Sequence, residues 1–436
     1  MLTEYSFGFG DQEIKAVLPR ERVINVVEGK PAKAVSDVEA AVREALNNPI
    51  GTPPLKEVVQ PGDKVIIIAS DITRQWVRHD LFLPALLNEL NMAGIPDKDI
   101  SLIVALGAHR HHTREENIMN FGKEIVNRIS ILQSHAPETE EFVPIGRTSR
   151  GKEVCMNKHV VQADKVILTG GIVHHLMAGF GGGRKAIIPG IASYRTIQEN
   201  HSLCLHQEIG KGVSPECIAG KLENNPMHAD MLEMAELLKP AFLLNAVFTP
   251  EGQFARFVAG HWYEAWLAGC QAVNEIFGVP ISSKTDLVIA SAGGFPKDIN
   301  LYQGSKTIGN SFMAVKSTGV VILLLECRDI MEPPDFSGWF QYESLYEREL
   351  ALREGFTVPG FIALKLGYMA KEVPHIVVSL PQNKDFIEKA GMLTAASLEE
   401  ALTMAEKILG KNDYTITVMA HGANTVPVET GTKQES

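Results

Sequence analysis

Residues 165–190 read Lys-Val-Ile-Leu-Thr-Gly-Gly-Ile-Val-His-His-Leu-Met-Ala-Gly-Phe-Gly-Gly-Gly-Arg-Lys-Ala-Ile-Ile-Pro-Gly. The run Lys165–Thr169 is short, β-branched and largely apolar, which predicts a strand covered on both faces. The glycines that come after it let main-chain N–H groups approach a ligand closely, and the Arg-Lys pair would suit an anionic one. This stretch therefore predicts a buried parallel strand that leads into a ligand-binding loop.

The glycine-rich loop matches neither of two common phosphate-binding motifs. In a standard phosphate loop Gly-Lys is followed by Ser or Thr, whereas Gly183 is followed by Arg184, Lys185 and Ala186, so the hydroxyl that would hold magnesium is missing. The G-x-G-x-x-G fingerprint also fails, because the glycines lie at 179 and 181–183. A flexible surface loop with a solvated Arg-Lys pair is the alternative to a ligand site.

The composition is that of a globular protein without a membrane or nucleic-acid partner. The chain has 436 residues, is 45% hydrophobic and 21% charged, and has a formal net charge of −11, which makes a general nucleic-acid role unlikely. No apolar run approaches the roughly 20 residues that a membrane span needs, and the N-terminus lacks a signal-peptide pattern. Five irregularly spaced cysteines without C-x-x-C fit a reducing compartment. We expect a cytoplasmic protein, and no feature indicates its oligomeric state.

Apolar runs alternate with helical patterns along most of the chain. The predicted strands are Val65–Ala69, Leu102–Leu106, Arg128–Gln133, Lys165–Thr169, Leu287–Ala290, Val320–Leu325, His375–Leu380 and Thr415–Met419. The predicted helices are Leu81–Met92, Arg114–Phe121, Met227–Leu238, His261–Glu275 and Leu398–Ile408. This alternation predicts an α/β fold of two doubly wound, Rossmann-like domains with the active site in the cleft between them.

We place the domain boundary where the pattern of helix His261–Glu275 ends and a fresh strand begins. The expected N-terminal α/β domain covers residues 1–278 and carries the glycine-rich loop. The expected C-terminal α/β domain covers 279–412. Residues 413–436 are expected to form a last strand and a polar tail that could return to the N-terminal domain.

Chemically active side chains lie directly after four of the predicted strands. In open α/β sheets ligands bind beyond the carboxyl ends of the strands. The four exits carry Asp71, Thr73 and Arg74; His109 within His-Arg-His-His; His174 and His175 before the glycine-rich loop; and Ser291–Pro296 with Asp298 soon after. Taken singly, Asp71 and Thr73 could cap a helix, and His109 could be a solvated imidazole. Together they predict a site at one sheet edge.

A further group lies on the helix predicted to begin at Leu301. Tyr302 and Lys306 are four residues apart, and Gln303 and Lys306 are three apart, so all three lie on one helix face. An ammonium and an amide on one face can grip a carboxylate, although an ordinary amphipathic helix would show the same pattern.

These segments resemble the lactate racemase family, the nickel-pincer-nucleotide enzymes. The matching segments are Asp71-x-Thr-Arg74, Gly107-x-His109-Arg110-x-x-Thr113, His175-x-x-Ala-Gly-Phe-x-Gly-Gly-Arg-Lys185, Asn200-His201 and Tyr302-Gln303-x-x-Lys306. They occur in the family's order and span most of the chain. The residues themselves predict an anionic-ligand cleft, whereas nickel and the cofactor are implied only by the resemblance.

The resemblance implies a racemase or epimerase of 2-hydroxy acids with a nickel-pincer nucleotide, a pyridinium-3,5-bisthiocarboxylic acid mononucleotide that holds nickel. Lys185 would tether the cofactor covalently, and His201 would ligate nickel. Cofactor contacts would come from Asp71, Thr73, Gly181, Gly182, Gly183 and Arg184. Protein made in a host without the cofactor-biosynthesis enzymes, which are the expected partners, would lack the cofactor.

The implied reaction is proton-coupled hydride transfer to the cofactor through a 2-keto acid. His109 and His175 would exchange the hydroxyl proton, because imidazole, with an unperturbed pKa near about 6.5, serves both directions. Arg74, Tyr302, Gln303 and Lys306 would bind the substrate, lactate or a related 2-hydroxycarboxylate. Phe361 is our expectation for the residue lining the side-chain pocket.

Two other functions stay open at the level of sequence. A nucleotide-dependent phosphotransferase would use the glycine-rich loop, although the missing Ser or Thr after Lys185 counts against it. A non-catalytic cofactor-binding protein would bind the cofactor and show no turnover.

Overall fold

The computed structural model describes residues 1–429, and these form two compact units. The N-terminal unit comprises Pro31–Cys204 and Glu216–Glu275. The C-terminal unit comprises Met1–Lys30, Leu205–Pro215 and the chain from Ile276 onward. Within residues 1–429, no helix has the length and apolar character needed to cross a membrane.

The N-terminal unit is built on a six-stranded sheet with the order β13-β12-β9-β4-β5-β6. All neighbours are parallel except β13, which runs antiparallel to β12. The strands are β4 (Val65–Ser70), β5 (Ile100–Gly107), β6 (Ser130–His135), β9 (Lys165–Gly171), β12 (Phe242–Phe248) and β13 (Phe254–Gly260). Every residue of β12 is buried and β4 is buried over Val65–Ala69, as expected for strands covered on both faces.

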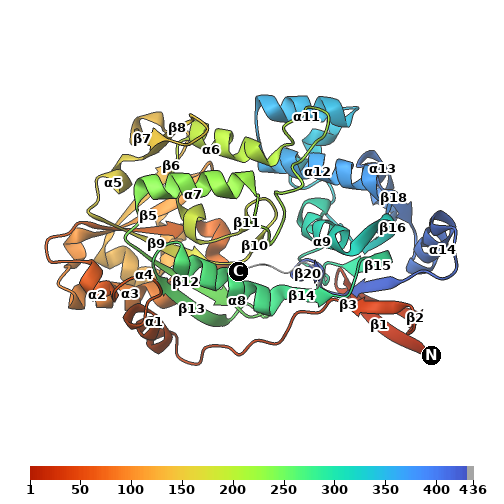
Figure 1. The fold of residues 1–436 in the computed structure, drawn as a ribbon, viewed down its shortest axis with the longest axis horizontal. Coiled ribbons are helices and arrows are strands. Elements are labelled where there is room, and N and C mark those ends of the chain that lie inside the picture. Colours follow the sequence, from red (N-terminus) through yellow and green to blue (C-terminus); the bar gives the residue numbers. More distant parts are fainter. Residues whose placement is uncertain (430–436) are drawn as a thin grey trace. The chain divides into compact units, whose positions relative to one another are not determined.

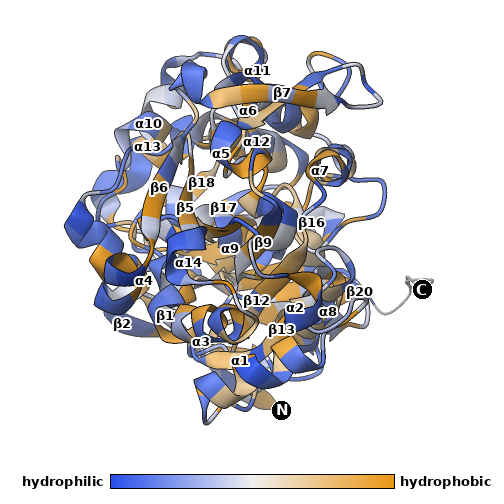
Figure 2. Ribbon diagram, turned by 90° about the vertical axis from the view of Figure 1, so that its left-hand side faces the viewer, coloured by the Kyte–Doolittle hydropathy of each residue, from blue (hydrophilic) through white to orange (hydrophobic). Residues whose placement is uncertain are grey.

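Helices and small hairpins surround this sheet (Figure 1). The helices are α1 (Val38–Asn47), α2 (Leu55–Val58), α3 (His79–Met92), α4 (Arg114–Arg128), α5 (Lys158–Val161), α6 (Tyr194–His201), α7 (Pro226–Leu238) and α8 (Glu264–Phe277). The hairpins pair β7 (Phe142–Arg147) with β8 (Glu153–Asn157), and β10 (His174–His175) with β11 (Gly179–Phe180). In Figure 2, β12 and β13 are coloured hydrophobic, whereas α1, which packs on β13, alternates between hydrophobic and hydrophilic.

The C-terminal unit repeats the doubly wound plan with an entirely parallel sheet, β18-β17-β16-β15-β19-β3. Its strands are β3 (Val23–Val26), β15 (Thr285–Ser291), β16 (Val315–Leu324), β17 (His375–Val378), β18 (Leu393–Ala395) and β19 (Ile416–Met419). A hairpin of β1 (Leu2–Phe9) and β2 (Gln12–Pro19) and a pair of β14 (Gly278–Ile281) and β20 (Val426–Glu429) complete the strands. The helices are α9 (Leu301–Ala314), α10 (Pro334–Ser337), α11 (Leu345–Glu354), α12 (Val358–Glu372), α13 (Lys384–Lys389) and α14 (Leu398–Leu409).

The predicted α/β fold with doubly wound parallel sheets is confirmed. Each predicted strand and helix has a counterpart, although the predicted helix Arg114–Phe121 continues as α4 to Arg128 beyond a break at Gly122, whose φ is +84°. The sequence missed β1, β2 and β7, which are half exposed and lack a continuous apolar run. It also missed β12 and β13, although both are largely buried.

The domain division differs from the expected one at both ends of the chain. The boundary lies at Glu275–Ile276, close to the expected position after 278. The first 30 residues, however, belong to the C-terminal unit, because β3 pairs with β19 and the β1–β2 hairpin packs on the core of that unit. In the predicted last segment, β19 pairs next to β15 and β20 pairs with β14, so both strands stay within that unit rather than returning to the N-terminal domain. The tail beyond residue 429 lies outside the described residues.

Candidate active site

The N-terminal unit has one topological switch point, between β4 and β9. From β4 the chain moves to β5 and β6 on one side of the sheet, and it then returns to β9 on the other side. Ligands of doubly wound sheets bind where the carboxyl ends of two such strands diverge. The short 3-10 turn Gly183–Ala186, at the end of the glycine-rich loop, contacts both strands. The predicted ligand loop therefore lies at the expected edge.

The exits of β4 and β5 meet in an aspartate–histidine pair. Asp71 is buried, and its Oδ2 lies 2.5 Å from Nδ1 of the half-exposed His109. Its Oδ1 accepts a hydrogen bond of 2.6 Å from the Thr73 hydroxyl. Burial would raise the pKa of Asp71, but the hydrogen bond and charge of His109, together with Thr73 and Arg74, lower it below its usual value. The carboxylate thus holds the proton of His109 on Nδ1, which leaves Nε2 as the acceptor nitrogen.

The loop that carries His109 is braced by residues that the sequence did not single out. Nε2 of His112 accepts the main-chain N–H of Ile72 at 2.9 Å, so its Nδ1 carries the proton shared with Asn117 at 3.0 Å. Thr113 then begins α4 in a capping box with Glu116. Residue type alone does not distinguish this bracing histidine from its neighbours in His-Arg-His-His.

The histidine doublet is divided between two environments. Nε2 of His174 lies 2.8 Å from Oδ1 of Asn274, and the His174 ring packs against Phe180. His175 instead accepts main-chain N–H groups of Met177 and Ala178 on Nδ1, at 3.3 and 3.2 Å. Burial first, and then the charges of Lys185, Arg74, His201 and Arg184, hold the pKa of His175 well below its usual value. His175 is therefore a neutral imidazole with its proton on Nε2.

Lys185 lies close enough to the cations Arg74 and Arg184 for their charges to affect its own. Burial, together with the charges of Arg184 and Arg74, lowers the pKa of Lys185 to about 7. Lys185 in turn lowers the pKa of both His175 and His201. A substantial fraction of its side chain is thus an uncharged amine at neutral pH, which is the nucleophilic form of lysine.

His201 lies at the end of α6, where its Nδ1 is bonded to the main chain. The ring is buried, and its Nδ1 donates to the main-chain oxygen of Ile197 at 3.0 Å. Burial, and then the charge of Lys185, lower the pKa of His201 to about 3. A neutral imidazole whose Nδ1–H is bonded to a carbonyl presents Nε2 as a lone pair, the usual state of a metal-ligating histidine.

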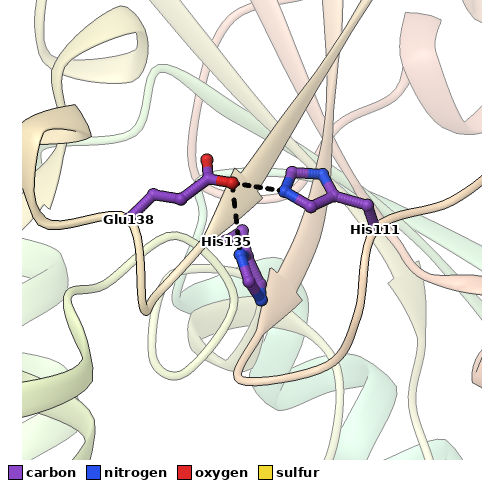
Figure 3. Close-up of side chains that lie close together, drawn as sticks. All are labelled: His111, His135 and Glu138. Carbon is purple, nitrogen blue, oxygen red and sulfur yellow. Dashed lines mark hydrogen bonds and ion pairs between the residues drawn. The ribbon is translucent and has the colours of Figure 1, made fainter.

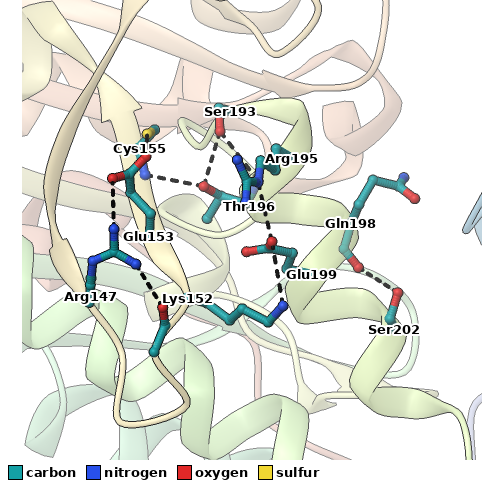
Figure 4. A network of polar contacts seen from close by, with 11 residues as sticks. Arg147, Lys152, Glu153, Cys155, Ser193, Arg195, Thr196, Gln198, Glu199 and Ser202 are labelled. Carbon is teal, nitrogen blue, oxygen red and sulfur yellow. Dashed lines mark hydrogen bonds and ion pairs between the residues drawn. The ribbon is translucent and has the colours of Figure 1, made fainter.

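Polar contacts fix α6 against the β7–β8 hairpin (Figure 4). The Thr196 hydroxyl accepts the main-chain N–H of Cys155 at 3.1 Å, and Glu199 lies 3.7 Å from the ammonium of Lys152. Ser193 caps the helix by accepting the N–H of Thr196. Since His201 is two residues beyond Glu199, these contacts set its position. None of them was evident from the sequence.

The glycines of the loop serve packing more than ligand contact. Gly181 donates its N–H to Val173, and Gly183 donates its N–H to Oδ1 of Asn245 at 2.8 Å. A Cβ on Gly183, whose φ is +50°, would lie 2.5 Å from the Trp266 ring, and a Cβ on Gly182 would lie 2.7 Å from Asn245. The expected cradle of loop amides around a phosphate is therefore not formed by Gly181 and Gly183.

Arg184 also differs from its expected role. The side chain is buried and stacks on Trp266 at 3.9 Å. Its guanidinium donates to His228 and to the main-chain oxygens of Ala178 and Phe180. Burial lowers its pKa to about 9. The guanidinium of Arg184 therefore cross-links the loop to its own backbone and to His228. This position gives no support to the predicted cofactor contact of Arg184.

The predicted substrate-binding residues are divided between the two units. Arg74 is exposed in the N-terminal unit, where its Nη1 donates to the Thr73 hydroxyl at 2.8 Å. Tyr302, Gln303 and Lys306 lie in the first two turns of α9, which Asn300 caps. Lys306 is exposed and Tyr302 packs edge-on against Phe336. A site between the units stays a prediction.

Two expectations for the C-terminal unit do not agree with the structure. Phe361 is expected to line a substrate pocket, but its side chain is fully buried in the core beside Phe356. The exit of β15 is expected to join the ligand edge, but Asp298 is buried and accepts the main-chain N–H of Gly10 at 2.7 Å. Both residues therefore support the fold of this unit.

Comparison with known proteins agrees with the resemblance of the motifs. Residues 9–212 match the lactate racemase N-terminal domain, and residues 281–427 match the lactate racemase C-terminal domain. The lactate racemase of Thermoanaerobacterium thermosaccharolyticum is 33% identical over 425 residues, which cover 96% of this chain and 97% of the relative. The lactate racemase of Lactiplantibacillus plantarum is 36% identical over 292 residues, 67% of this chain and 66% of the relative.

Solved structures give the same result. The lactate racemase apoprotein of T. thermosaccharolyticum superposes with a TM-score of 0.85 at 31% identity, covering 98% of this chain and all of the other. A protein from Thermotoga maritima shares the fold, with a TM-score of 0.60 at 15% identity over 92% of this chain. Identity of this extent over nearly the whole length establishes that the chain belongs to the lactate racemase family and is an isomerase of the racemase class.

Proposed function

We propose that the protein racemises a 2-hydroxy acid, lactate or a close relative, at the carboxyl ends of β4, β5 and β9. The observation that carries this proposal is the aspartate–histidine pair at the exits of β4 and β5, where Oδ2 of Asp71 lies 2.5 Å from Nδ1 of His109. In addition to burial, the charges of Lys185 and Arg74 lower the pKa of His175, and the charge of Lys185 lowers that of His201, which supports a shared site. His109 joins them through Asp71, whose pKa responds to both His109 and Arg74. The names of the two relatives favour lactate as substrate.

The residues fit a covalently held nickel-pincer nucleotide. The amine of Lys185, with a pKa of about 7, suits an amide-type tether, and His201 offers a neutral nitrogen of the kind that nickel binds. When bound, the cofactor supplies a reversible acceptor for the hydrogen on the substrate's α-carbon. Asp71, Thr73 and Gly182 are proposed to contact it.

We propose that the two catalytic histidines begin the reaction with different ring nitrogens protonated. Nε2 of His109 is held as a proton acceptor by Asp71, whereas Nε2 of His175 carries a proton because Nδ1 accepts two main-chain N–H groups. As the α-hydrogen leaves, the hydroxyl proton would pass to His109, and the substrate becomes a 2-keto acid. On return of the hydrogen to the other face, the His109 imidazolium would give the proton back to the oxygen, to which Nε2–H of the neutral His175 donates a hydrogen bond. The reverse reaction follows the same steps from the other enantiomer.

Cationic groups are proposed to hold the substrate carboxylate throughout. Arg74 is exposed beside the aspartate–histidine pair, which supports an anion-binding role for its guanidinium. Tyr302, Gln303 and Lys306 are proposed to complete the carboxylate site. A carboxylate held at a fixed point lets the planar keto acid turn without escaping.

The test is a chiral screen of 2-hydroxy acids with protein co-expressed with the cofactor-making enzymes. We expect racemisation of lactate or a related acid, stoichiometric nickel, and a mass adduct on the peptide that contains Lys185. Lys185→Ala should lose the adduct and the activity, whereas Lys123→Ala, at an exposed position on α4, should keep both. Racemisation by the Lys185→Ala variant would contradict the tether. An adduct without turnover on any acid would indicate a cofactor-binding protein instead.

A further inference from the structure

A second group of metal-binding side chains lies on the N-terminal unit. His111 comes from the loop after β5, His135 is the last residue of β6, and Glu138 lies in the next turn. Their ligand atoms all lie within 4.8 Å of one another (Figure 3). Among the described residues this is the one group of three or more His, Cys, Asp or Glu with such spacing. It is separate from the residues proposed to hold the cofactor.

The orientation of Gln133 determines which nitrogen of His111 carries a proton. Oε1 of Gln133 accepts the main-chain N–H of His112 at 2.7 Å, and Nε2 of Gln133 donates to the main-chain oxygen of His112 at 3.1 Å. These two bonds fix the amide, so its oxygen is the atom that faces Nδ1 of His111 at 3.3 Å. Nδ1 must therefore be the donor.

The other nitrogen of His111 then faces a second acceptor. Nε2 lies 2.5 Å from Oε1 of Glu138, and Nδ1 of His135 lies 3.4 Å from the same oxygen. A neutral imidazole has one proton, which Gln133 already receives, so the Nε2 lone pair of His111 points at a carboxylate. A cation ligated by both would satisfy the lone pair and the carboxylate, and a hydrogen bond from Nδ1–H to an amide oxygen is a usual support for a metal-ligating histidine.

The donor set and its exposure select the kind of metal. Glu138 is half exposed beside the two imidazoles, and a glutamate is ordinarily a carboxylate at neutral pH. Two imidazoles and one carboxylate are the three-ligand set of open zinc sites. Imidazole favours borderline ions such as Zn²⁺, Co²⁺ and Ni²⁺ over Mg²⁺ or Ca²⁺. The side chains of His111 and Glu138 are 45% and 47% exposed, so an ion has a direct route in.

We propose that His111, His135 and Glu138 bind one divalent ion of this class, with water in the remaining coordination position. The ion would join the loop Gly107–Thr113, which carries His109, to the turn after β6. The proposal does not depend on the racemase chemistry, since neither His109 nor His201 is a ligand of this ion.

The experiment is a Co²⁺ titration of the full chain, purified without the cofactor and with any affinity tag removed. We expect one equivalent to give the visible absorption bands of a low-coordinate site, and Zn²⁺ to displace it. His111→Ala, His135→Ala and Glu138→Gln should each weaken binding at least about tenfold, because each removes one of three ligands. The metal should raise the melting temperature of the wild type and not of these variants.

Two further variants separate this site from others. His159→Ala is the matched control, because His159 lies 3.5 Å from a carboxylate oxygen of Glu141 and no third ligand joins that pair in the described structure. His201→Ala tests the cofactor position. Both should bind Co²⁺ as the wild type does. Equal loss in His159→Ala, loss confined to His201→Ala, or no saturable binding would each overturn the proposal, and the last would leave His111 as an imidazolium paired with Glu138.

Discussion

The two units use the same sheet plan and differ in the segments that occupy the exits of their central strands. In the N-terminal unit, the exits of β4 and β9 hold Asp71, His175 and Lys185, and burial together with the charge of Lys185 lowers the pKa of His175. In the C-terminal unit, the equivalent switch point lies between β15 and β19. There the exit of β15 is occupied by the turn of the β1–β2 hairpin, since Phe295 donates to the main-chain oxygen of Gly10 at 2.9 Å.

The contrast shows that sheet topology creates a possible ligand-binding edge in each unit, and that the segments packed on this edge determine whether a ligand can bind. Gly8 and Gly294 allow the hairpin to approach closely, because a Cβ on Gly8 would lie 2.6 Å from the backbone of Gly293 and one on Gly294 would lie 2.7 Å from Gly10. The Ser291 hydroxyl donates to the main-chain oxygen of Gly8. An edge filled by backbone in this way offers no room for a ligand at the same point.

The largest expected difference comes from replacing one histidine with glutamine at the ligand edge of each sheet. His109→Gln should lower racemisation by about 10²–10⁴-fold, the range associated with loss of a general acid or base. His421→Gln, at the exit of β19, should leave the rate essentially unchanged. Chiral chromatography of both reaction directions measures this. A comparable loss in both variants would remove the distinction between the edges.

A smaller loss should result from removal of the charge behind His109. Asp71→Asn should reduce the turnover number at least about tenfold and less than His109→Gln does, because the imidazole remains but its proton is no longer held on Nδ1. The pKa of Asp71 is lowered, so the stability contributed by the pair is present above about pH 3.9 and is lost as pH falls below it. A wild-type rate in Asp71→Asn would contradict the pairing.

The pH dependence of Lys185 acylation tests the electrostatics of the N-terminal edge. Burial and nearby cations disfavour the ammonium, so the amine appears as pH rises through about 7 rather than near the ordinary lysine value of about 10.4. Mass spectrometry of cofactor-free protein pulsed with acetic anhydride should show a midpoint near 7. Arg74→Gln should raise that midpoint, since one cation is gone. An ordinary midpoint in the wild type would contradict the proposed tether chemistry.

The smallest effect concerns the closed edge of the C-terminal unit. Gly294→Ala should destabilise this unit by about 1–3 kcal/mol, because φ is +80° and the added methyl meets the Gly10 oxygen. Gly309→Ala is the matched control on α9, where the space is open and alanine should stabilise by about 0.5–1 kcal/mol. Urea unfolding compares the two. Equal stability of both variants would indicate that the hairpin does not close the edge.

The sequence predicted the elements, and the meeting of Asp71 with His109, better than the packing roles of the loop residues. Strand exits brought Asp71 and His109 together although they are 38 residues apart. The glycine-rich loop is predicted to be a ligand cradle, but packing around Trp266 and Asn245 accounts for Gly182 and Gly183. Such packing involves residues more than 60 positions away, which no local pattern reveals.

The N-terminal hairpin shows a second limit of sequence patterns. Its strands are half exposed, with alternating burial that differs from the continuous apolar runs of the sheet. Nothing in residues 1–30 indicates that they pack on strands more than 250 positions later. The same reason explains Phe361, an aromatic residue whose burial depends on α12 packing in three dimensions.

The tautomers of His109 and His175 test the account's central claim most directly. Long-range nitrogen–proton NMR of protein labelled with ¹⁵N-histidine, assigned with His109→Gln and His175→Gln, reports which ring nitrogen carries the proton. We expect the proton on Nδ1 of His109 and on Nε2 of His175, so that His109 can accept the hydroxyl proton and His175 can donate a hydrogen bond to the substrate oxygen. The same tautomer for both rings, or a doubly protonated His175, would contradict the account.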